Sequence, residues 1–89
     1  MWSREQVRVV FANIADTWPR YGLTGDGKTS WAAALKPFDY EVAMRSITEH
    51  RRRQIEASER IRREPAWEPI LSELLGCCRL FVAQSSTDA

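Results

Sequence analysis

Apolar residues recur at intervals of three and four near the start of this chain, which is the spacing of one face of an amphipathic α-helix. The residues that form this stripe are Val7, Val10, Phe11, Ile14 and Trp18. Ser3 and Gln6 precede it with the spacing of a capping box, in which each side chain bonds the backbone of the other residue. We therefore predict a helix that begins after Ser3 and ends near Thr17, because Pro19 disfavours the helical conformation at Trp18.

A segment rich in glycine and small polar residues, 19–30, comes next and is typical of a loop. Trp31 and Leu35 are then four positions apart, with alanines between them. This spacing predicts a short second helix that ends before Pro37. The polar residues that could cap its start are Asp26, Thr29 and Ser30.

The longest helical signal runs from Asp39 to Glu64 and contains no glycine or proline. Asp39 is a suitable N-cap and Pro65 cannot continue a helix, so one long third helix is predicted over this range. Four glutamates precede an arginine by four positions, the favourable order for helical ion pairs: Glu41–Arg45, Glu49–Arg53, Glu56–Arg60 and Glu59–Arg63. Apolar residues are dense only in the first half, so the second half should project from the core or end early.

The remainder of the chain contains a corner and a fourth helical pattern. Two prolines flank Trp67 in the segment 65–69, which predicts a rigid corner with the tryptophan as a packing anchor. The next apolar stripe consists of Ile70, Leu71, Leu74, Leu75, Cys78, Phe81 and Val82. Gly76 could end this helix early, and residues 84–89 are predicted to be a disordered tail. The whole pattern predicts an all-α fold, a small bundle of four helices in one domain (residues 1–83) with a long third helix rich in Arg and Glu.

The composition indicates more about the cellular compartment of the protein than about its chemistry. The net charge of +1 does not by itself indicate a nucleic-acid partner, although arginines are concentrated in positions 45–63. Cys77 and Cys78 are adjacent, so they should not bridge each other and cannot form a zinc site alone. We expect two reduced thiols, at least one of them buried, in a cytoplasmic protein. No signal peptide or membrane-spanning window is visible, so a membrane partner is not expected.

The segment from Gly22 to Thr29 matches the G-x-x-x-x-G-K-[ST] pattern of a phosphate-binding loop. In such a loop Lys28 would reach phosphate oxygens and Thr29 would hold Mg²⁺. A phosphate-binding loop must follow a buried parallel strand, whereas a helical stripe that ends at Trp18 precedes this segment. We interpret the match as a glycine-rich loop between helices, with at most a weak affinity for anions.

Residues with catalytic potential are sparse in this sequence. His50 is the single histidine and lies beside arginines on the long third helix, where we expect its side chain to be exposed to solvent. The sequence therefore contains no second histidine that could form a proton relay or a metal cluster with His50. No Ser/His/Asp or Cys/His set with suitable spacing is present. We predict that the protein is not an enzyme and has no catalytic residues, no bound metal and no cofactor.

Several aromatic, proline and helix-start residues together carry a family resemblance. They are Trp18-Pro19, Trp31, Leu35, Phe38, Tyr40, Glu41, Ile47, Pro65 and Pro69. Their order resembles the N-terminal domain of phage-type replicative helicase loader/inhibitor proteins, over about positions 3–75. The resemblance implies a small adaptor of phage or prophage type that binds a hexameric DnaB-type helicase in the bacterial cytoplasm, restrains it and helps deliver it to a replication origin. That family binds largely through a flexible C-terminal segment, which is very short here, so another surface would be used.

Arginine and tryptophan are the residues that protein interface hot spots favour. We therefore predict a partner-binding surface made of Arg51, Arg52, Arg53, Arg60, Arg63, Trp67 and Leu71. Its partner would be the helicase or another host nucleic-acid machine that the protein inhibits. The arginines have two other interpretations: a solvated face neutralised by glutamates, or a surface that binds nucleic-acid phosphates. A homodimer seeded by Ile55 and Ile61, with Cys77 or Phe81, is a further alternative.

Overall fold

The computed structural model describes residues 2–87, and these form four α-helices with connecting segments and no β-strand. The helices are α1 (Arg4–Thr17), α2 (Gly25–Leu35), α3 (Tyr40–Ile61) and α4 (Leu71–Thr87). The longest is α3, with 22 residues. The predicted all-α fold, a small bundle of four helices with a long third helix, is therefore confirmed.

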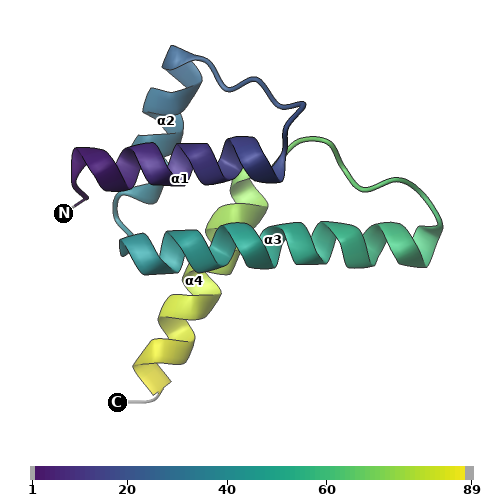
Figure 1. Cartoon of the computed structure of the whole chain (residues 1–89). Helices are drawn as coiled ribbons and strands as arrows, with labels where there is room; N and C mark the ends of the chain where they lie inside the picture. The colour runs from purple at the N-terminus through teal and green to yellow at the C-terminus, as the bar shows by residue number, and fades with distance from the viewer. Residues whose placement is uncertain (1, 88–89) are drawn as a thin grey trace.

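The bundle is organised around α3, which packs against both α1 and α4 (Figure 1). α1 runs beside α3 in the same direction, and α4 crosses α3 obliquely. The far end of α3 extends beyond this crossing, and the segment 62–70 returns from that end to the start of α4 (Figure 1). The resulting molecule is flat, with extents of 40 × 36 × 17 Å. The second half of α3 projects, as its shortage of apolar residues predicts.

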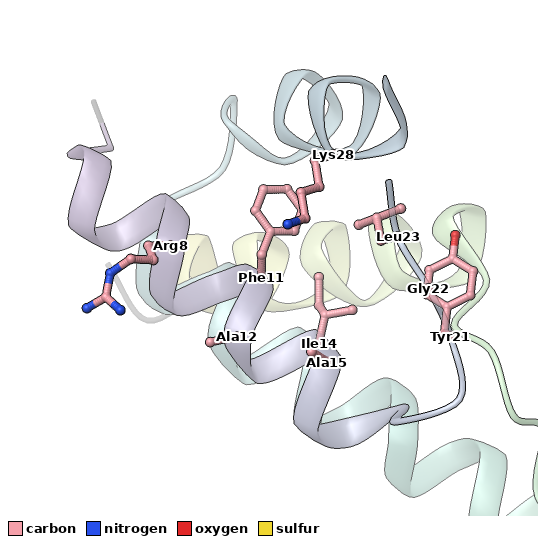
Figure 2. Close-up of a pocket in the computed structure, with 9 residues that line it drawn as sticks. All are labelled: Arg8, Phe11, Ala12, Ile14, Ala15, Tyr21, Gly22, Leu23 and Lys28. Carbon is pink, nitrogen blue, oxygen red and sulfur yellow. The ribbon is translucent and has the colours of Figure 1, made fainter. Parts of the chain in front are cut away.

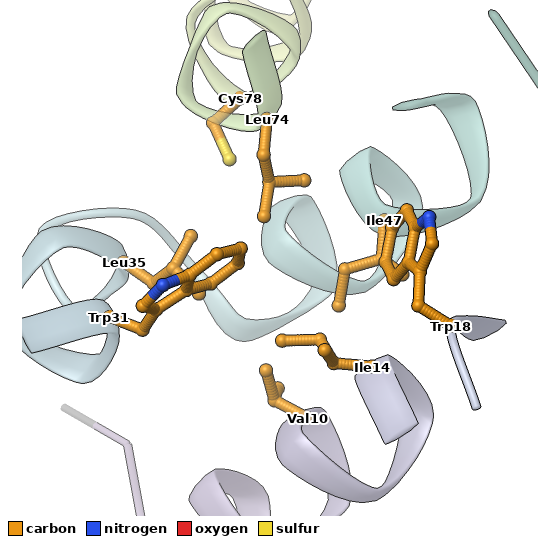
Figure 3. Close-up of a cluster of buried hydrophobic side chains, with 8 residues drawn as sticks. All are labelled: Val10, Ile14, Trp18, Trp31, Leu35, Ile47, Leu74 and Cys78. Carbon is orange, nitrogen blue, oxygen red and sulfur yellow. The ribbon is translucent and has the colours of Figure 1, made fainter. Parts of the chain in front are cut away.

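The hydrophobic core combines side chains from every helix, together with the tryptophan that directly follows α1 (Figure 3). Its buried members are Val10, Ile14, Trp18, Trp31, Leu35, Ile47, Leu74 and Cys78. Figure 3 shows Ile14 of α1 pointing toward Ile47 of α3, with Leu74 of α4 entering from the opposite side. Each fully buried aliphatic side chain of this kind stabilises the fold by about 1.5–3 kcal/mol. The apolar stripes predicted from spacing therefore face one another.

Ser3 and Gln6 form the predicted capping box at the start of α1. The Gln6 backbone N–H donates to Ser3 Oγ at 3.1 Å, and the Ser3 N–H donates to Gln6 Oε1 at 2.9 Å. The helix ends at Thr17, as the proline two residues later predicts. Local sequence alone therefore sets both ends of α1.

The start of α2 differs from the prediction, because the helix begins at Gly25 with Thr24 as its N-cap. A Cβ added at Gly27 would lie 2.8 Å from Leu23 Cδ1, so glycine leaves room for the Leu23 side chain against the first turn. This packing outweighs the low helix propensity of glycine. The residues predicted to cap the helix lie inside it: Asp26, Thr29 and Ser30.

α3 ends at Ile61, earlier than predicted, because the chain leaves the helix through a left-handed residue. Arg62 has φ 55° and ψ 46°. Its N–H donates to the Glu59 carbonyl at 3.3 Å, and the Arg63 N–H donates to the Ser58 carbonyl at 3.0 Å. The two bonds form a Schellman motif, which satisfies carbonyl groups left over at the end of a helix. Pro65 therefore lies beyond the end of α3 and is not the reason that the helix ends.

The substitution Arg62→Gly should raise the free energy of unfolding by about 0.5–1 kcal/mol, because glycine adopts the left-handed conformation without steric cost. Arg62 makes no side-chain ion pair within the described part of the chain, so no attraction is lost. Urea denaturation measures the change. Arg62→Ala is the control and should give no gain, because alanine keeps the Cβ. An equal gain from alanine would contradict the prediction.

α4 begins at Leu71 and continues through Gly76 to Thr87. Gly76 does not end the helix, because Leu74 and Cys78 on either side of it are buried in the core. The helix also extends into the tail predicted to be disordered. Residues 84–87 of that tail are helical, and residues 88–89 lie outside the described residues.

Candidate functional site

An open groove of about 840 Å³ lies between the second half of α3, the segment 62–70 and α4, and we call it the α3–α4 groove. Its apolar and small lining residues are Ala57, Ile61, Ala66, Ile70, Gly76, Cys77 and Leu80. Its polar and charged lining residues are His50, Arg53, Gln54, Ser58, Arg60, Arg63, Glu64 and Glu73. An apolar surface bordered by polar groups is typical of a protein-binding site.

Three large apolar side chains of the groove are exposed to solvent. Ile61 is 64% exposed, Ile70 is 42% exposed and Leu80 is 40% exposed. They come from the last residue of α3, from the corner before α4 and from α4 itself. Single exposed apolar residues are ordinary, whereas several that line one groove indicate an interaction surface.

The arginines of the groove differ in whether a carboxylate neutralises them. Arg53 Nε donates to Glu49 Oε2 at 2.8 Å, which is the one predicted i,i+4 pair that forms within residues 2–87. Arg60 and Arg63 make no ion pair with any described residue. The interpretation of the arginines as a neutralised, solvated face therefore holds for Arg53 but not for Arg60 and Arg63.

The other predicted partner-binding residues lie outside the groove. Arg52 is held by two glutamates, one turn before it and one turn after it. Arg51 and Trp67 line a separate pocket of about 380 Å³, and Arg51 Nη1 donates to the Ala66 carbonyl at 2.7 Å. Leu71 is half-buried against the hydrophobic core. The structure thus brings Arg53, Arg60 and Arg63 to one groove and leaves the remaining four predicted residues elsewhere.

His50 is buried, with 1% of its surface exposed, and the expectation of a solvent-exposed side chain is wrong. Its Nε2 accepts the backbone N–H of Ile70 at 3.1 Å, so in the neutral ring the proton resides on Nδ1. Nδ1 lies 3.9 Å from the Glu73 carboxylate, and the ring packs against the indole of Trp18 at 5.6 Å between centroids. No local pattern reveals this role, because Ile70 is 20 positions away in the sequence.

Gln54 is a second residue whose role the sequence analysis missed. Its Oε1 accepts from Trp18 Nε1 at 2.7 Å and from Arg51 Nη1 at 3.1 Å. Its Nε2 donates to the Glu68 carbonyl at 3.0 Å. These bonds attach the segment 62–70 to α3 and to the end of α1. One wall of the groove is therefore fixed in place by side-chain hydrogen bonds.

Burial lowers the pKa of His50 below its ordinary value of 6.5. The Glu73 carboxylate opposes this shift, and the guanidinium groups of Arg51 and Arg53 add to it. Because the folded-state pKa is depressed, the unfolded chain binds more protons than the folded chain as the pH falls. The stability that His50 contributes is therefore complete above pH 6.5 and is lost as the pH falls through the folded-state pKa.

We expect the free energy of unfolding to fall as the pH decreases below 6.5, by at most about 1.4 kcal/mol per pH unit for one proton. His50→Gln should flatten this part of the profile, because glutamine can accept the Ile70 N–H but does not titrate. Urea unfolding curves at a series of pH values measure the effect. A wild-type profile as flat as that of the variant would contradict this role of His50.

Both cysteines are buried free thiols, so the prediction that at least one is buried is confirmed. Burial raises the pKa of Cys77 and of Cys78. A raised pKa disfavours the reactive thiolate at neutral pH. Cys78 contributes to the core, and Cys77 lines the α3–α4 groove. Their environment suits packing rather than nucleophilic chemistry.

The segment that matches a phosphate-binding loop begins between α1 and α2, continues into α2, and contributes to a separate pocket of about 470 Å³ (Figure 2). It follows a helix, not a strand, and its second half forms the first turns of α2. Figure 2 shows Lys28 beside the ring of Phe11, with Leu23 and Tyr21 along the same pocket. The predicted interhelical loop is therefore only partly present, because the residues from Gly25 onward belong to α2.

Other classes of site have no candidate in the described residues. No group of three or more His, Cys, Asp or Glu side chains could hold a metal ion within residues 2–87. None of the helices in this range is long and apolar enough to cross a bilayer. Comparison of the chain with protein-family models, with curated proteins and with solved structures finds no match. The groove and the sequence pattern are therefore the features that bear on function.

Proposed function

We propose that this protein is a non-enzymatic adaptor that binds a partner protein through the α3–α4 groove. The observation that carries the proposal is the exposed apolar surface of the groove beside Arg60 and Arg63, which make no ion pair with any residue that the structure describes. Apolar anchors next to arginine are the combination that protein interfaces favour. The titratable groups of the groove support binding rather than a reaction, because His50 already accepts a backbone N–H and burial keeps Cys77 protonated.

The groove is suited to binding because its walls are already in place before a partner arrives. Gln54 and His50 attach the segment 62–70 to α3, through Glu68 and Ile70. A partner would not have to order this wall, which reduces the entropic cost of association. The exposed apolar side chains can then contribute to affinity without a large conformational change.

The partner that we propose is a hexameric DnaB-type replicative helicase, and the setting is the cytoplasm of a bacterial host. The support is the resemblance to phage-type helicase loader/inhibitor proteins. Several residues that carry it, Trp18, Trp31, Leu35 and Ile47, form the hydrophobic core of this fold. Because these residues are buried, they are not accessible to a partner, whereas Ile61, Ile70 and Leu80 of the α3–α4 groove are exposed. The proposal therefore assigns helicase binding to the groove.

The exposed arginines at the end of α3 also favour a second candidate, a nucleic-acid-binding protein. Arg60, Arg62 and Arg63 are exposed and make no ion pair within the described residues. The glutamates paired with Arg52 and Arg53 weaken this candidate. Binding through phosphates would lose affinity steeply with salt, since it depends on counterion release. Binding through an apolar groove would not lose affinity steeply as the salt concentration rises.

Co-elution with a bacterial DnaB-type helicase on a sizing column tests the proposal, at about 50 and about 200 mM salt and with duplex DNA in parallel. We expect a helicase complex at both salt concentrations and no DNA complex at the higher one. DNA binding at low salt without a helicase complex would transfer the function to the second candidate. The absence of both complexes would exclude the helicase and direct the search to another host nucleic-acid machine.

A further inference from the structure

Gly76 lies within α4, at a position where its backbone lines the α3–α4 groove. A Cβ added there would meet no atom of another part of the chain within 4 Å. Glycine in a helix interior is destabilising relative to alanine. The isolated chain therefore has no need of glycine at this position, in contrast to Gly27, where the Leu23 side chain lies against the backbone.

Other small residues line the α3–α4 groove together with Gly76. Ala57 of α3 and Cys77 of α4 are also small and also line the groove. Small side chains let the backbone of a second helix approach closely. A helix that binds in a groove presents apolar residues spaced three, four and seven positions apart. Ile61 and Leu80 offer exposed apolar surface for such a helical face.

The charges of the groove indicate which polar residues such a helix would carry. Three arginines and two glutamates line the groove. Glu73 of α4 faces Nδ1 of His50 at 3.9 Å, but the neutral ring does not offset the Glu73 carboxylate, whereas the charge of Arg53 is offset by Glu49, outside the groove. Glu64 then remains beside Arg60 and Arg63, which have no carboxylate partner among the described residues. The α3 end of the groove therefore has an excess of positive charge, while Glu73 lies on the α4 side.

We infer that the α3–α4 groove receives an amphipathic helix of the partner protein, which crosses α4 at Gly76. This helix rests its apolar face on Ile61 and Leu80 and directs acidic side chains toward Arg60 and Arg63. The inference rests on the proposed function only in taking the groove as the binding site. It does not depend on the partner being a helicase.

Two substitutions at Gly76 separate binding from folding. Gly76→Ala should raise the temperature of unfolding, because alanine favours the helix and meets no other atom. It should nevertheless weaken binding, because its Cβ occupies the place where the partner helix crosses. Gly76→Leu should weaken binding about tenfold or more, with an unchanged circular dichroism spectrum. If glycine were present for folding alone, binding would follow stability and Gly76→Ala would not weaken it.

The probe is a displayed library of peptides about 20 residues long, selected against the full chain, because it does not require the helicase. We expect selected peptides to carry apolar residues at helical spacing and an excess of Asp and Glu. Their affinity should fall about tenfold or more with Gly76→Leu and with Arg60→Glu/Arg63→Glu. Peptides rich in Lys and Arg, peptides with the alternating pattern of a strand, or equal affinity for Gly76→Leu would overturn the inference.

Two further measurements distinguish the inferred partner helix from a second copy of this chain and from another binding site for the helicase. Light scattering that shows a dimer for the wild-type chain and a monomer for Gly76→Leu would place a second copy in the groove and overturn the inference. A helicase that binds Gly76→Leu as tightly as the wild-type chain would also overturn it, while the adaptor function would stand. Selected acidic helices without any helicase complex would support the inference and remove the helicase as partner.

Discussion

Replacing Trp18 with alanine should lower the free energy of unfolding by about 3–5 kcal/mol, a large part of the stability of a small domain. Trp18 is 1% exposed and belongs to the hydrophobic core. Its indole packs against His50, and Nε1 donates to Gln54 Oε1 at 2.7 Å. The substitution removes this packing and takes one donor from the glutamine that holds the groove wall. Urea denaturation followed by circular dichroism measures the loss.

Trp67→Ala is the matched control, because it removes the same side chain from an exposed position. Trp67 is 53% exposed, so its loss should change the free energy of unfolding by about 0.5 kcal/mol or less. The sequence pattern predicts a packing role for both tryptophans, but of the two only Trp18 is buried in the core. Similar losses for the two variants would contradict this difference in burial.

The double substitution Arg60→Glu/Arg63→Glu should weaken binding of the DnaB-type helicase about 100-fold. Each change replaces an attraction with a repulsion at the rim of the groove, and about 1.4 kcal/mol at each position gives a factor of ten. Neither arginine makes an ion pair within the described residues, so the fold should be unaffected. Surface plasmon resonance at moderate salt measures the affinity, with circular dichroism as the check on folding.

Arg4→Glu/Lys36→Glu is the control for this prediction, since it makes the same change in net charge outside the groove. Arg4 and Lys36 are exposed, and neither lines the α3–α4 groove. The affinity of this variant should stay within about twofold of the wild-type value, because screening limits the reach of exposed charges. A loss as large as that of the groove variant would show that overall charge, and not the groove, governs binding.

The helices of this protein were largely predictable because each carries its own local signals. The capping box of Ser3 and Gln6 and the proline after Trp18 set the ends of α1. The end of α3 was not predictable, because Arg62 adopts a left-handed conformation that arginine does not favour. The start of α2 depends on the packing of Leu23 against Gly27, which the helix propensities of the residues do not predict.

The candidate site was predictable only in part, because the groove is assembled from segments far apart in the sequence. The arginine run indicated an interface, and three of its arginines line the groove. His50 and Gln54 were missed, since their partners Ile70 and Trp18 are 20 and 36 positions away. Gly76 drew attention as a possible end of α4, whereas in the structure it lies within α4 and lines the groove.

Hydrogen-exchange mass spectrometry of the chain with and without the DnaB-type helicase tests most directly the claim that the α3–α4 groove is the binding site. The groove account predicts slower exchange in peptides from the end of α3, residues 57–63, and from the middle of α4, residues 73–80. Exchange in residues 4–12 of α1 should not change. Protection confined to α1 and α2, with none at the groove in a saturated complex, would contradict the account.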